Sequence, residues 1–318
     1  MTRSDKLSDL APEHSLKRLE LAVTRRLDGL LHGEHLGMLP GPGSDLAEAR
    51  LYQPGEDDIR HMDWAVTART TVPHVRDLIA DHELETWALV DMSSSMDFGT
   101  ARMEKRDLVV AALASIGFLT ARLGDRLGAY VMHAEGLRRW PARTGRTAMY
   151  MLLRALLEAP RGTAGNEGPA LAEALTLLAR TQYKRGLRVV ISDFLDHDET
   201  PGGDLAWERP MRRLAARHQV IAVEIVDPRE LDLPDVGPVM MTDPETGQVR
   251  EIILSRKVRA AYAAAAAAQR ARTREVLHGC GVPHLVLRTD RDWISDVARF
   301  ALRQRRVAGL ARPQGSRA

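Results

Sequence analysis

The sequence predicts an α/β protein with a doubly wound, mostly parallel sheet flanked by helices and an N-terminal helix and loop extension. Two observations predict this fold. Apolar runs such as 87–90 and 187–191 are too short for helices and continuous enough to be buried on both faces of a sheet. Such runs alternate with segments whose apolar residues have helical spacing, which is typical of parallel strands joined by helices.

Composition limits the class of protein. The 318 residues suffice for one large α/β domain with an appendage, or for two domains. A formal net charge of +2 gives no global field that would recruit nucleic acid or an anionic membrane. The single cysteine, Cys280, excludes an intrachain disulfide and favours a reducing compartment. Because no apolar run approaches the ~20 residues of a membrane span, we expect a cytoplasmic protein without membrane insertion.

The apolar spacing predicts the elements of the first two thirds of the chain. A helix is expected near residues 16–31, and the Gly/Pro-rich stretch 33–43 ends it. After the strand at 87–90, a long helix is expected from about residue 102 to 123. The alternation then predicts, in order, strand 127–133, helix 147–157, helix 169–180, strand 187–191, helix 205–217 and strand 220–226.

The last third carries a hairpin signal and one further repeat of the unit. Two short apolar segments, 239–241 and 249–253, flank the turn-forming residues 243–247. They are followed by an alanine-rich helix to residue 277, a strand at 284–287 and a helix at 293–302. The expected divisions are an N-terminal helix and Gly/Pro loop (1–49), a segment packed on the main domain (50–84), the α/β domain (85–304) and a basic, disordered tail (305–318).

Three oxygen-bearing side chains follow the strand at 87–90: Asp91, Ser93 and Ser95. Residues i, i+2 and i+4 of a tight loop can converge on one point. Such a point suits Mg²⁺, which prefers one or two carboxylates, hydroxyls and retained waters. Asp193 ends the strand at 187–191, so it belongs at the same sheet edge and is the candidate second carboxylate. The alternative is a polar strand-to-helix turn in which a serine caps the helix.

Residues 50–76 form the most distinctive block of the chain. Pro54-Gly55 marks a turn, and the opposite charges around it can satisfy one another through arginine forks. One interpretation is a salt-bridged loop that braces aromatic side chains, and the other is an interaction surface, which Trp and Arg typically anchor. Because the block enters the first strand within roughly twenty residues, we expect it to pack beside the metal edge. Its candidate interaction or supporting residues are Tyr52, Asp58, Arg60, Asp63, Trp64 and Arg69.

Two motifs carry a resemblance to known families. Asp-x-Ser-x-Ser at 91–95 resembles the metal-ion-dependent adhesion site of von Willebrand factor type A domains. Together with the block Tyr-x-Pro-Gly-Glu-Asp-Asp-x-Arg-x-x-Asp-Trp at 52–64, it looks like the bacterial family catalogued as domain of unknown function 58. This resemblance implies a von Willebrand factor A-like fold and service as a metal-site adaptor for a MoxR-type AAA+ ATPase. Some members carry two amino-terminal membrane helices, which this sequence is expected to lack.

The resemblance also implies a threonine ligand from a Gly-Gly-Thr loop. The nearest match here is Arg161-Gly162-Thr163, in which Arg161 replaces the first glycine and the spacer to the next helix is longer. The candidate metal ligands are therefore Asp91, Ser93, Ser95, Asp193 and Thr163, with Asn166 as an alternative to Thr163. Asp97 lies close to the loop in sequence, where a supporting hydrogen bond is expected rather than ligation.

Three functions remain open from the sequence. The first is a non-enzymatic binding module whose weakly held Mg²⁺, Mn²⁺ or Ca²⁺ accepts an acidic side chain from a partner protein. The second is a phosphoryl-transfer enzyme that uses Asp91 with Mg²⁺, although position 93 is Ser where that chemistry calls for a second carboxylate. The third is a purely structural interaction domain without bound metal. We favour the binding module.

Overall fold

The structure of the protein is a computed structural model. It describes residues 19, 23, 49–53, 62, 64–76, 85–121, 125–162, 168–195, 204–242 and 249–310. Its main sheet has six strands in the order β10-β7-β6-β3-β4-β5. The strands are β3 (Glu85–Asp91), β4 (Arg126–His133), β5 (Gly136–Arg143), β6 (Leu187–Ser192), β7 (Gln219–Val226) and β10 (His284–Arg288). All neighbouring pairs are parallel except β4 with the edge strand β5. The predicted doubly wound, mostly parallel sheet is therefore confirmed.

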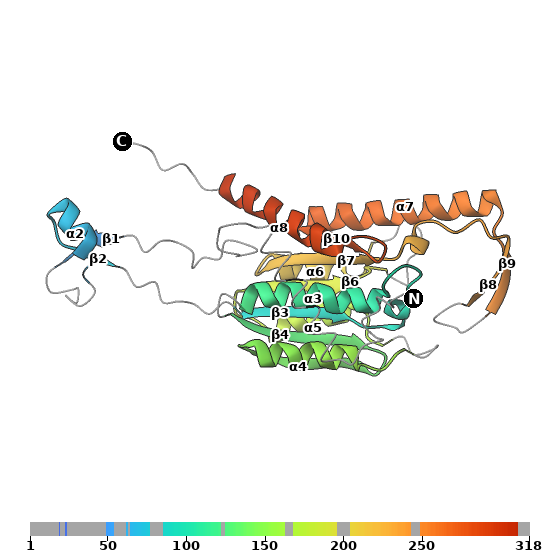
Figure 1. Cartoon of the computed structure of the whole chain (residues 1–318), viewed down its shortest axis with the longest axis horizontal. Helices are drawn as coiled ribbons and strands as arrows, with labels where there is room; N and C mark the ends of the chain where they lie inside the picture. The colour runs from blue at the N-terminus through green and yellow to red at the C-terminus, as the bar shows by residue number, and fades with distance from the viewer. Residues whose placement is uncertain are drawn as a thin grey trace, which may run out of the picture.

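Helices cover both faces of this sheet (Figure 1). One face carries α3 (Lys105–Ala121), α4 (Arg146–Leu157) and α8 (Trp293–Leu310), whose buried residues form one core cluster with the strands. The other face carries α5 (Leu171–Thr181), α6 (Glu208–Ala215) and the C-terminal part of α7 (Arg256–Gly279). Successive residues of a strand point to opposite faces, so the continuous apolar runs of β3 and β6 supply both clusters.

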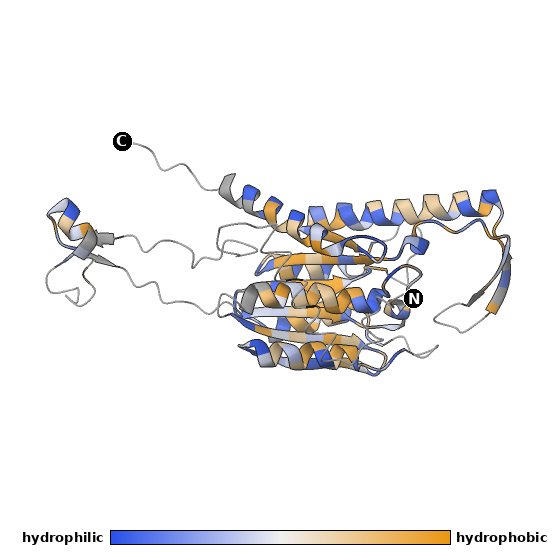
Figure 2. Cartoon of the chain, in the orientation of Figure 1, coloured by the Kyte–Doolittle hydropathy of each residue, from blue (hydrophilic) through white to orange (hydrophobic). Residues whose placement is uncertain are grey.

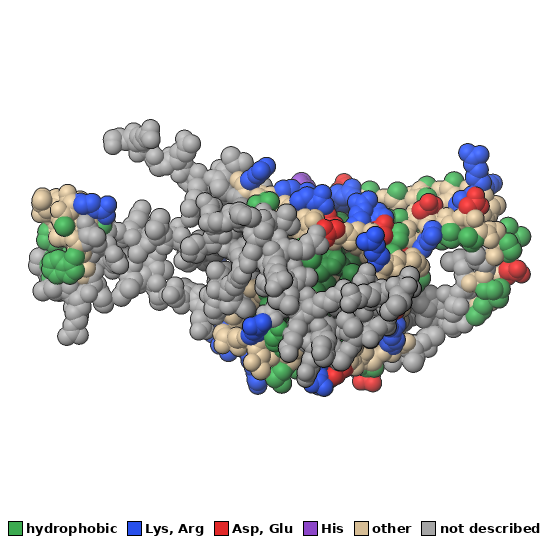
Figure 3. Space-filling view, in the orientation of Figure 1, with side chains coloured by type: hydrophobic (Ala, Val, Ile, Leu, Met, Phe, Trp, Pro, Cys, Tyr) green, Lys and Arg blue, Asp and Glu red, His purple; other side chains and the backbone are tan. Residues whose placement is uncertain are grey.

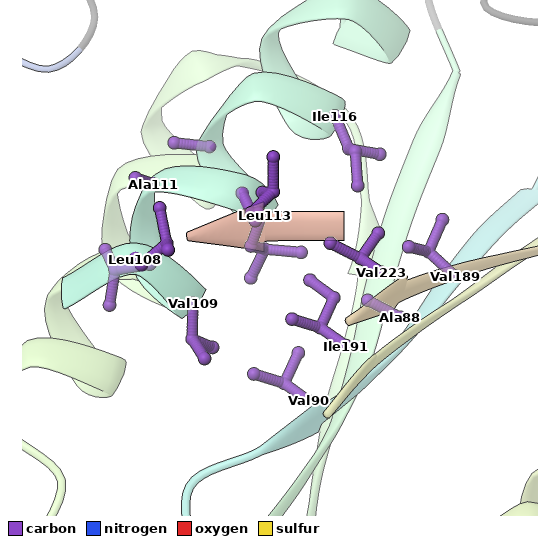
Figure 4. Packing of buried hydrophobic residues seen from close by; sticks show 14 of the residues in the cluster. Ala88, Val90, Leu108, Val109, Ala111, Leu113, Ile116, Val189, Ile191 and Val223 are labelled. Atoms are coloured by element: carbon purple, nitrogen blue, oxygen red, sulfur yellow. The ribbon is translucent and has the colours of Figure 1, made fainter. Parts of the chain in front are cut away.

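The packing of α3 on the central strands forms the middle of the first cluster. Figure 4 shows Leu108, Leu113 and Ile116 of α3 on one side and Val90 and Ile191 of the sheet on the other. Hydropathy follows the same layers, with hydrophobic residues concentrated in the strands and in the helix faces against them (Figure 2). This close packing holds the start of α3 beside the carboxyl end of β3.

Several boundaries differ from the sequence prediction. The edge strand β5 is not predicted, and α8 continues to Leu310, so the start of the expected disordered tail at residue 305 is wrong. Leu19 and Val23 are helical and buried in the first core cluster, as expected for the N-terminal helix; the rest of that helix and the Gly/Pro loop lie outside the described residues. None of the described helices combines the length and hydrophobicity that a bilayer crossing requires.

Two small strand pairs lie outside the main sheet. The predicted hairpin is present as β8 (Pro238–Thr242) paired antiparallel with β9 (Val249–Ile253). It projects beyond the sheet with the first turns of α7, and hydrophobic side chains lie on its surface (Figure 3). Met240 and Ile253 are 66% and 69% exposed. The second pair joins β1 (Ala49–Leu51) to β2 (His74–Arg76), with α2 (Trp64–Thr70) between them in the chain.

Candidate functional site

The candidate site lies where the strand order reverses. The chain runs from β3 through β4 to β5 toward one edge of the sheet, and from β6 through β7 to β10 toward the other. The neighbours β3 and β6 therefore flank the topological switch point, where doubly wound sheets bind ligands at the carboxyl ends of the strands. Asp91 ends β3, and Ser192 and Asp193 stand at the end of β6.

The loop after β3 brings Asp91, Ser93 and Ser95 together. Oδ1 of Asp91 accepts hydrogen bonds from the backbone N–H of Ser93 at 3.0 Å and from its hydroxyl at 2.6 Å. A 3₁₀ helix, η3 (Ser94–Asp97), then turns the chain back, so that the Oγ atoms of Ser93 and Ser95 lie 3.2 Å apart. The i, i+2, i+4 spacing thus places three oxygen-bearing side chains around one point.

The end of β6 closes the other side of this point. The Ser192 hydroxyl donates to Oδ2 of Asp91 at 2.7 Å, and the Ser95 hydroxyl hydrogen-bonds the Asp193 carboxylate. Oδ1 of Asp193 also accepts from the N–H of Leu195 at 3.1 Å. The structure therefore connects the two predicted carboxylates through a chain of hydroxyl groups.

Phe194 fixes the direction in which the chain leaves Asp193. Its φ of 55° is a left-handed conformation that a bulky residue rarely adopts. The side chain is fully buried and packs edge-on against Trp207, with ring centroids 5.4 Å apart. The aromatic contact holds a backbone conformation that is unfavourable by itself.

A buried lysine, which the sequence prediction missed, lies at the base of the site. Nζ of Lys105 is 2.8 Å from Oδ2 of Asp193 and 2.5 Å from Oε1 of Glu230, and its side chain is 0% exposed. Glu230 ends η4 (Pro228–Glu230), and its Oε2 accepts from Arg270 of α7 at 3.1 Å. These residues are far apart in sequence, and a lysine at a helix start is normally solvated, so no local pattern identifies them.

The two carboxylates have opposite electrostatic surroundings. Burial raises the pKa of Asp91, and the neighbouring charge of Asp193 raises it further. Burial also acts to raise the pKa of Asp193, but the Lys105 ammonium outweighs it and the pKa of Asp193 is lowered. Asp91 is only 5% exposed, and no Lys, Arg or His of the described residues is paired with it. Asp91 is thus a buried carboxylate whose donors, in the part of the chain that the structure describes, are hydroxyl and N–H groups.

The segment that leads into Thr163 is held against the Asp91 loop. Asp97, for which a supporting role is expected, accepts from Arg106 at 2.7 Å and from the N–H of Gly162 at 2.7 Å. Arg106 also donates to the carbonyl of Pro160 at 2.9 Å. A Cβ on Gly162 would lie 2.7 Å from Cβ of Ser94, so glycine is required for this close approach. Thr163 and Asn166 themselves lie outside the described residues.

The donor chemistry fits a hard cation. Asp91, Ser93 and Ser95 offer one carboxylate and two hydroxyls, and Mg²⁺ ligands at 2.0–2.1 Å in octahedral geometry lie about 3 Å apart, close to the 3.2 Å between the serine oxygens. Across the described ranges, no cluster of three His, Cys, Asp or Glu side chains could hold a metal ion. The arrangement therefore suits an open site with hydroxyl ligands and not a closed cage of the zinc type.

The structure does not bring the block around Trp64 to this site. Trp64 is 68% exposed on α2, and the unit of β1, α2 and β2 lies beyond the end of the sheet where β3 begins (Figure 1). The chain enters β3 at its amino end, whereas Asp91 stands at its carboxyl end, so short sequence separation does not imply proximity. A seven-residue strand places roughly 20 Å between the two ends. The expectation that this block packs beside the metal edge is therefore corrected.

Within that block, the described residues contact one another. The N–H of Tyr52 donates to the carbonyl of Pro73 at 2.9 Å, and the N–H of His74 donates to Oγ1 of Thr67 at 3.0 Å. Arg69 lies in the last turn of α2. Asp58, Arg60 and Asp63 lie outside the described residues. The role of this block as an interaction surface stays a prediction.

A six-stranded, doubly wound sheet with one antiparallel edge strand and an Asp-x-Ser-x-Ser loop at its switch point defines an α/β domain of the von Willebrand factor A type. Residues 48–272 match the family described as "Protein of unknown function DUF58". The chain belongs to this family, as its sequence motifs predict.

Relatives and solved structures are similar over most of the chain. The uncharacterized protein Rv1480 of Mycobacterium tuberculosis is 52% identical over 308 residues, which cover 97% of this chain and 94% of the relative. BatB of Bacteroides thetaiotaomicron is 17% identical, with a TM-score of 0.40 over 70% of this chain and 99% of that one. A von Willebrand factor type A protein of Catenulispora acidiphila is 14% identical, with a TM-score of 0.37 over 74% of this chain and 44% of that one.

Proposed function

We propose that the protein is a non-enzymatic, metal-dependent protein-binding module. Asp91, Ser93 and Ser95 would hold Mg²⁺, or Mn²⁺ or Ca²⁺, with Asp193 as the second carboxylate beside them and the loop of Thr163 as a further source of oxygen. The observation that carries the proposal is Asp91: a buried carboxylate that has hydroxyl donors and no cationic partner among the described residues. A bound divalent cation would supply the missing positive charge.

Weak binding and partner recognition follow from the same ligand set. Neutral hydroxyls and waters contribute little charge, so the cation is held loosely and stays electrophilic. A carboxylate from a partner protein would complete its coordination in a partly desolvated contact, where a charge-assisted interaction contributes more than in water. Recognition would therefore require the metal.

We propose a MoxR-type AAA+ ATPase as the partner, with the complex formed in the cytoplasm. The support is the resemblance carried by the motifs around Trp64 and Asp91. A net charge of +2 gives no reason to expect nucleic acid as the partner.

Phosphoryl transfer by Asp91 is the alternative, and Lys105 is the observation that favours it, because that chemistry uses a lysine near the nucleophile. Three features weigh against it. The Lys105 ammonium is already bound by Asp193 and Glu230, and position 93 is Ser where a second carboxylate is needed. Each carboxylate oxygen of Asp91 also accepts a hydrogen bond from a serine hydroxyl, which makes Asp91 a weaker nucleophile. We therefore keep this reaction as an outcome of the test.

The test is a pull-down of the AAA+ ATPase with the full chain in Mg²⁺ and in EDTA. We expect binding in Mg²⁺ that is lost in EDTA and in the double variant Ser93→Ala/Ser95→Ala. Ser94→Ala is the matched control, because it removes a hydroxyl from the same loop that takes no part in the hydrogen bonds around Asp91. Binding that ignores chelation and the double variant would contradict the proposal. Phosphatase activity abolished by Asp91→Asn would establish the enzyme instead.

A further inference from the structure

The site contains a buried ammonium group, that of Lys105, beside Asp193, one of its two carboxylates. Lys105 extends from the first turn of α3 to Asp193 and Glu230, at 2.8 Å and 2.5 Å. The exposed fractions of the three side chains are 0%, 3% and 15%, so water screens these contacts very little.

Neighbouring groups hold this ammonium in place. Arg270 donates to Glu224 at 2.6 Å, to Glu230 at 3.1 Å and to the backbone carbonyl of Asp193 at 2.8 Å. Oε2 of Glu230 also accepts from the N–H of Asp227 at 3.0 Å. Since Arg270 and a backbone N–H bind the far oxygen of Glu230, the near oxygen remains for Lys105. The position of the ammonium is therefore set by four elements of the fold: α3, η4, α7 and the end of β6.

The consequence for Asp193 is that its carboxylate already has a cationic partner inside the protein. Oδ2 is bound by Lys105, and the N–H of Leu195 and the hydroxyl of Ser95 also donate to the carboxylate. Among the described residues, Asp91 has only neutral donors. A divalent cation beside Asp91, Ser93 and Ser95 would thus meet one carboxylate without a cationic partner instead of two.

We propose that Lys105 is a positioning residue that fixes the ligand charge of the metal site. It keeps Asp193 from direct coordination, so that Asp193 acts on the cation through Ser95, and it leaves the cation short of one negative charge. The partner's acidic side chain supplies that charge. This inference rests on the proposed function and deepens it, because it names the residue that creates the demand for an acidic partner.

The experiment measures Mn²⁺ binding alone by calorimetry, without partner, for the wild type and for Lys105→Met and Lys105→Arg. Removing the ammonium frees the Asp193 carboxylate, so we expect Lys105→Met to bind Mn²⁺ at least about tenfold more tightly than the wild type. Lys105→Arg keeps the charge and is expected to stay within about threefold of the wild type. Loss of structure would weaken metal binding, so a gain in affinity separates this role from a merely structural one.

Two further variants make every outcome decisive. Lys105→Met/Glu230→Gln removes the ammonium together with one of its carboxylates, and it replaces Lys105→Met if thermal melting shows that the single variant is unfolded. Suppose that the wild type binds Mn²⁺ and Asp91→Ala does not. If folded Lys105→Met, or the double variant, then binds Mn²⁺ no more tightly than the wild type, the inference about Lys105 is wrong and the proposed function stands. If the wild type and Asp91→Ala bind Mn²⁺ equally, or neither binds, the proposed function fails first.

Discussion

The backbone N–H of Gly162 donates a 2.7 Å hydrogen bond to Oδ2 of Asp97, which joins two loops that are 65 residues apart in sequence. The other oxygen of Asp97 is bound by Arg106, which reaches back to the carbonyl of Pro160. Asp97 therefore holds the segment before Thr163 against the loop of Ser93 and Ser95.

Gly162→Ala should disrupt this contact. The new Cβ would lie 2.7 Å from Cβ and 2.8 Å from Cα of Ser94, so one of the two loops must move. We expect a loss of about 1–3 kcal/mol in the free energy of unfolding, together with weaker Mg²⁺ binding. Denaturant titration and calorimetry measure the two effects. Gly279→Ala is the control, because its Cβ meets no atom within 4 Å at the end of α7, and it should lower neither the free energy of unfolding nor the Mg²⁺ affinity. Equal behaviour of the two variants would contradict the role of the contact.

Neutralising the two carboxylates should change the stability of the metal-free protein in opposite directions. The raised pKa of Asp91 means that its ionised form is disfavoured by folding, so Asp91→Asn should raise the free energy of unfolding by about 1 kcal/mol in EDTA at pH 7. The pKa of Asp193 is lowered by Lys105, so its ionised form is favoured by folding. Asp193→Asn should therefore lower the free energy of unfolding by about 2–4 kcal/mol.

Thermal unfolding in EDTA measures both variants. Addition of Mg²⁺ should stabilise the wild type and leave Asp91→Asn unaffected, because a ligand stabilises only the state that binds it. If both substitutions lower the melting temperature equally in EDTA, the electrostatic difference between the two carboxylates does not exist.

His218 gives stability a pH dependence unrelated to the metal site. Burial and the charges of Arg188 and Arg217 lower its pKa to about 4 from an ordinary 6.5, and both ring nitrogens are buried without hydrogen bonds to the described residues. The unfolded state therefore takes up this proton first, and stability is lost as the pH falls from about 6.5 to about 4. Between about pH 6.5 and pH 4.5, the wild type should lose about 2 kcal/mol more of its free energy of unfolding than His218→Gln does. Urea unfolding of the two proteins at these two pH values measures the difference. Parallel stability curves for the two proteins would refute it.

Arg188 should be a stability residue at the amino end of β6. Its side chain is buried and donates to the backbone carbonyls of Glu85, Gln182, Lys184 and Leu187. Arg188→Ala leaves these carbonyls without their donor and should reduce the free energy of unfolding by about 3 kcal/mol. Arg180→Ala, which removes an exposed guanidinium from α5, should change it by less than about 0.5 kcal/mol. Guanidinium chloride titration of both variants compares them directly.

The central fold could be predicted because its signals are local. The apolar runs that became β3 and β6 are buried on both faces, and that environment leaves no polar alternation in the sequence. Asp91 and Asp193 follow those runs directly, so parallel topology alone places them at one edge.

The missed features depend on contacts that no local pattern records. β5 reads Gly-Leu-Arg-Arg-Trp-Pro-Ala-Arg because it is an edge strand with exposed side chains and a proline, which an edge tolerates. Lys105 meets Glu230 across 125 residues of sequence and Asp193 across 88. The expected proximity of Trp64 to Asp91 is wrong because a short sequence separation brings the block of Trp64 only to the amino end of β3, and Asp91 stands at the other end of the strand.

The left-handed backbone of Phe194 ties the direction of the Asp193 carboxylate to the aromatic contact with Trp207. The indole N–H of Trp207 donates no hydrogen bond to the described residues, yet a smaller side chain at position 207 would release Phe194 and let Asp193 turn. Substitutions at position 207 would then be constrained by partner binding as well as by folding, although the residue lies in the core.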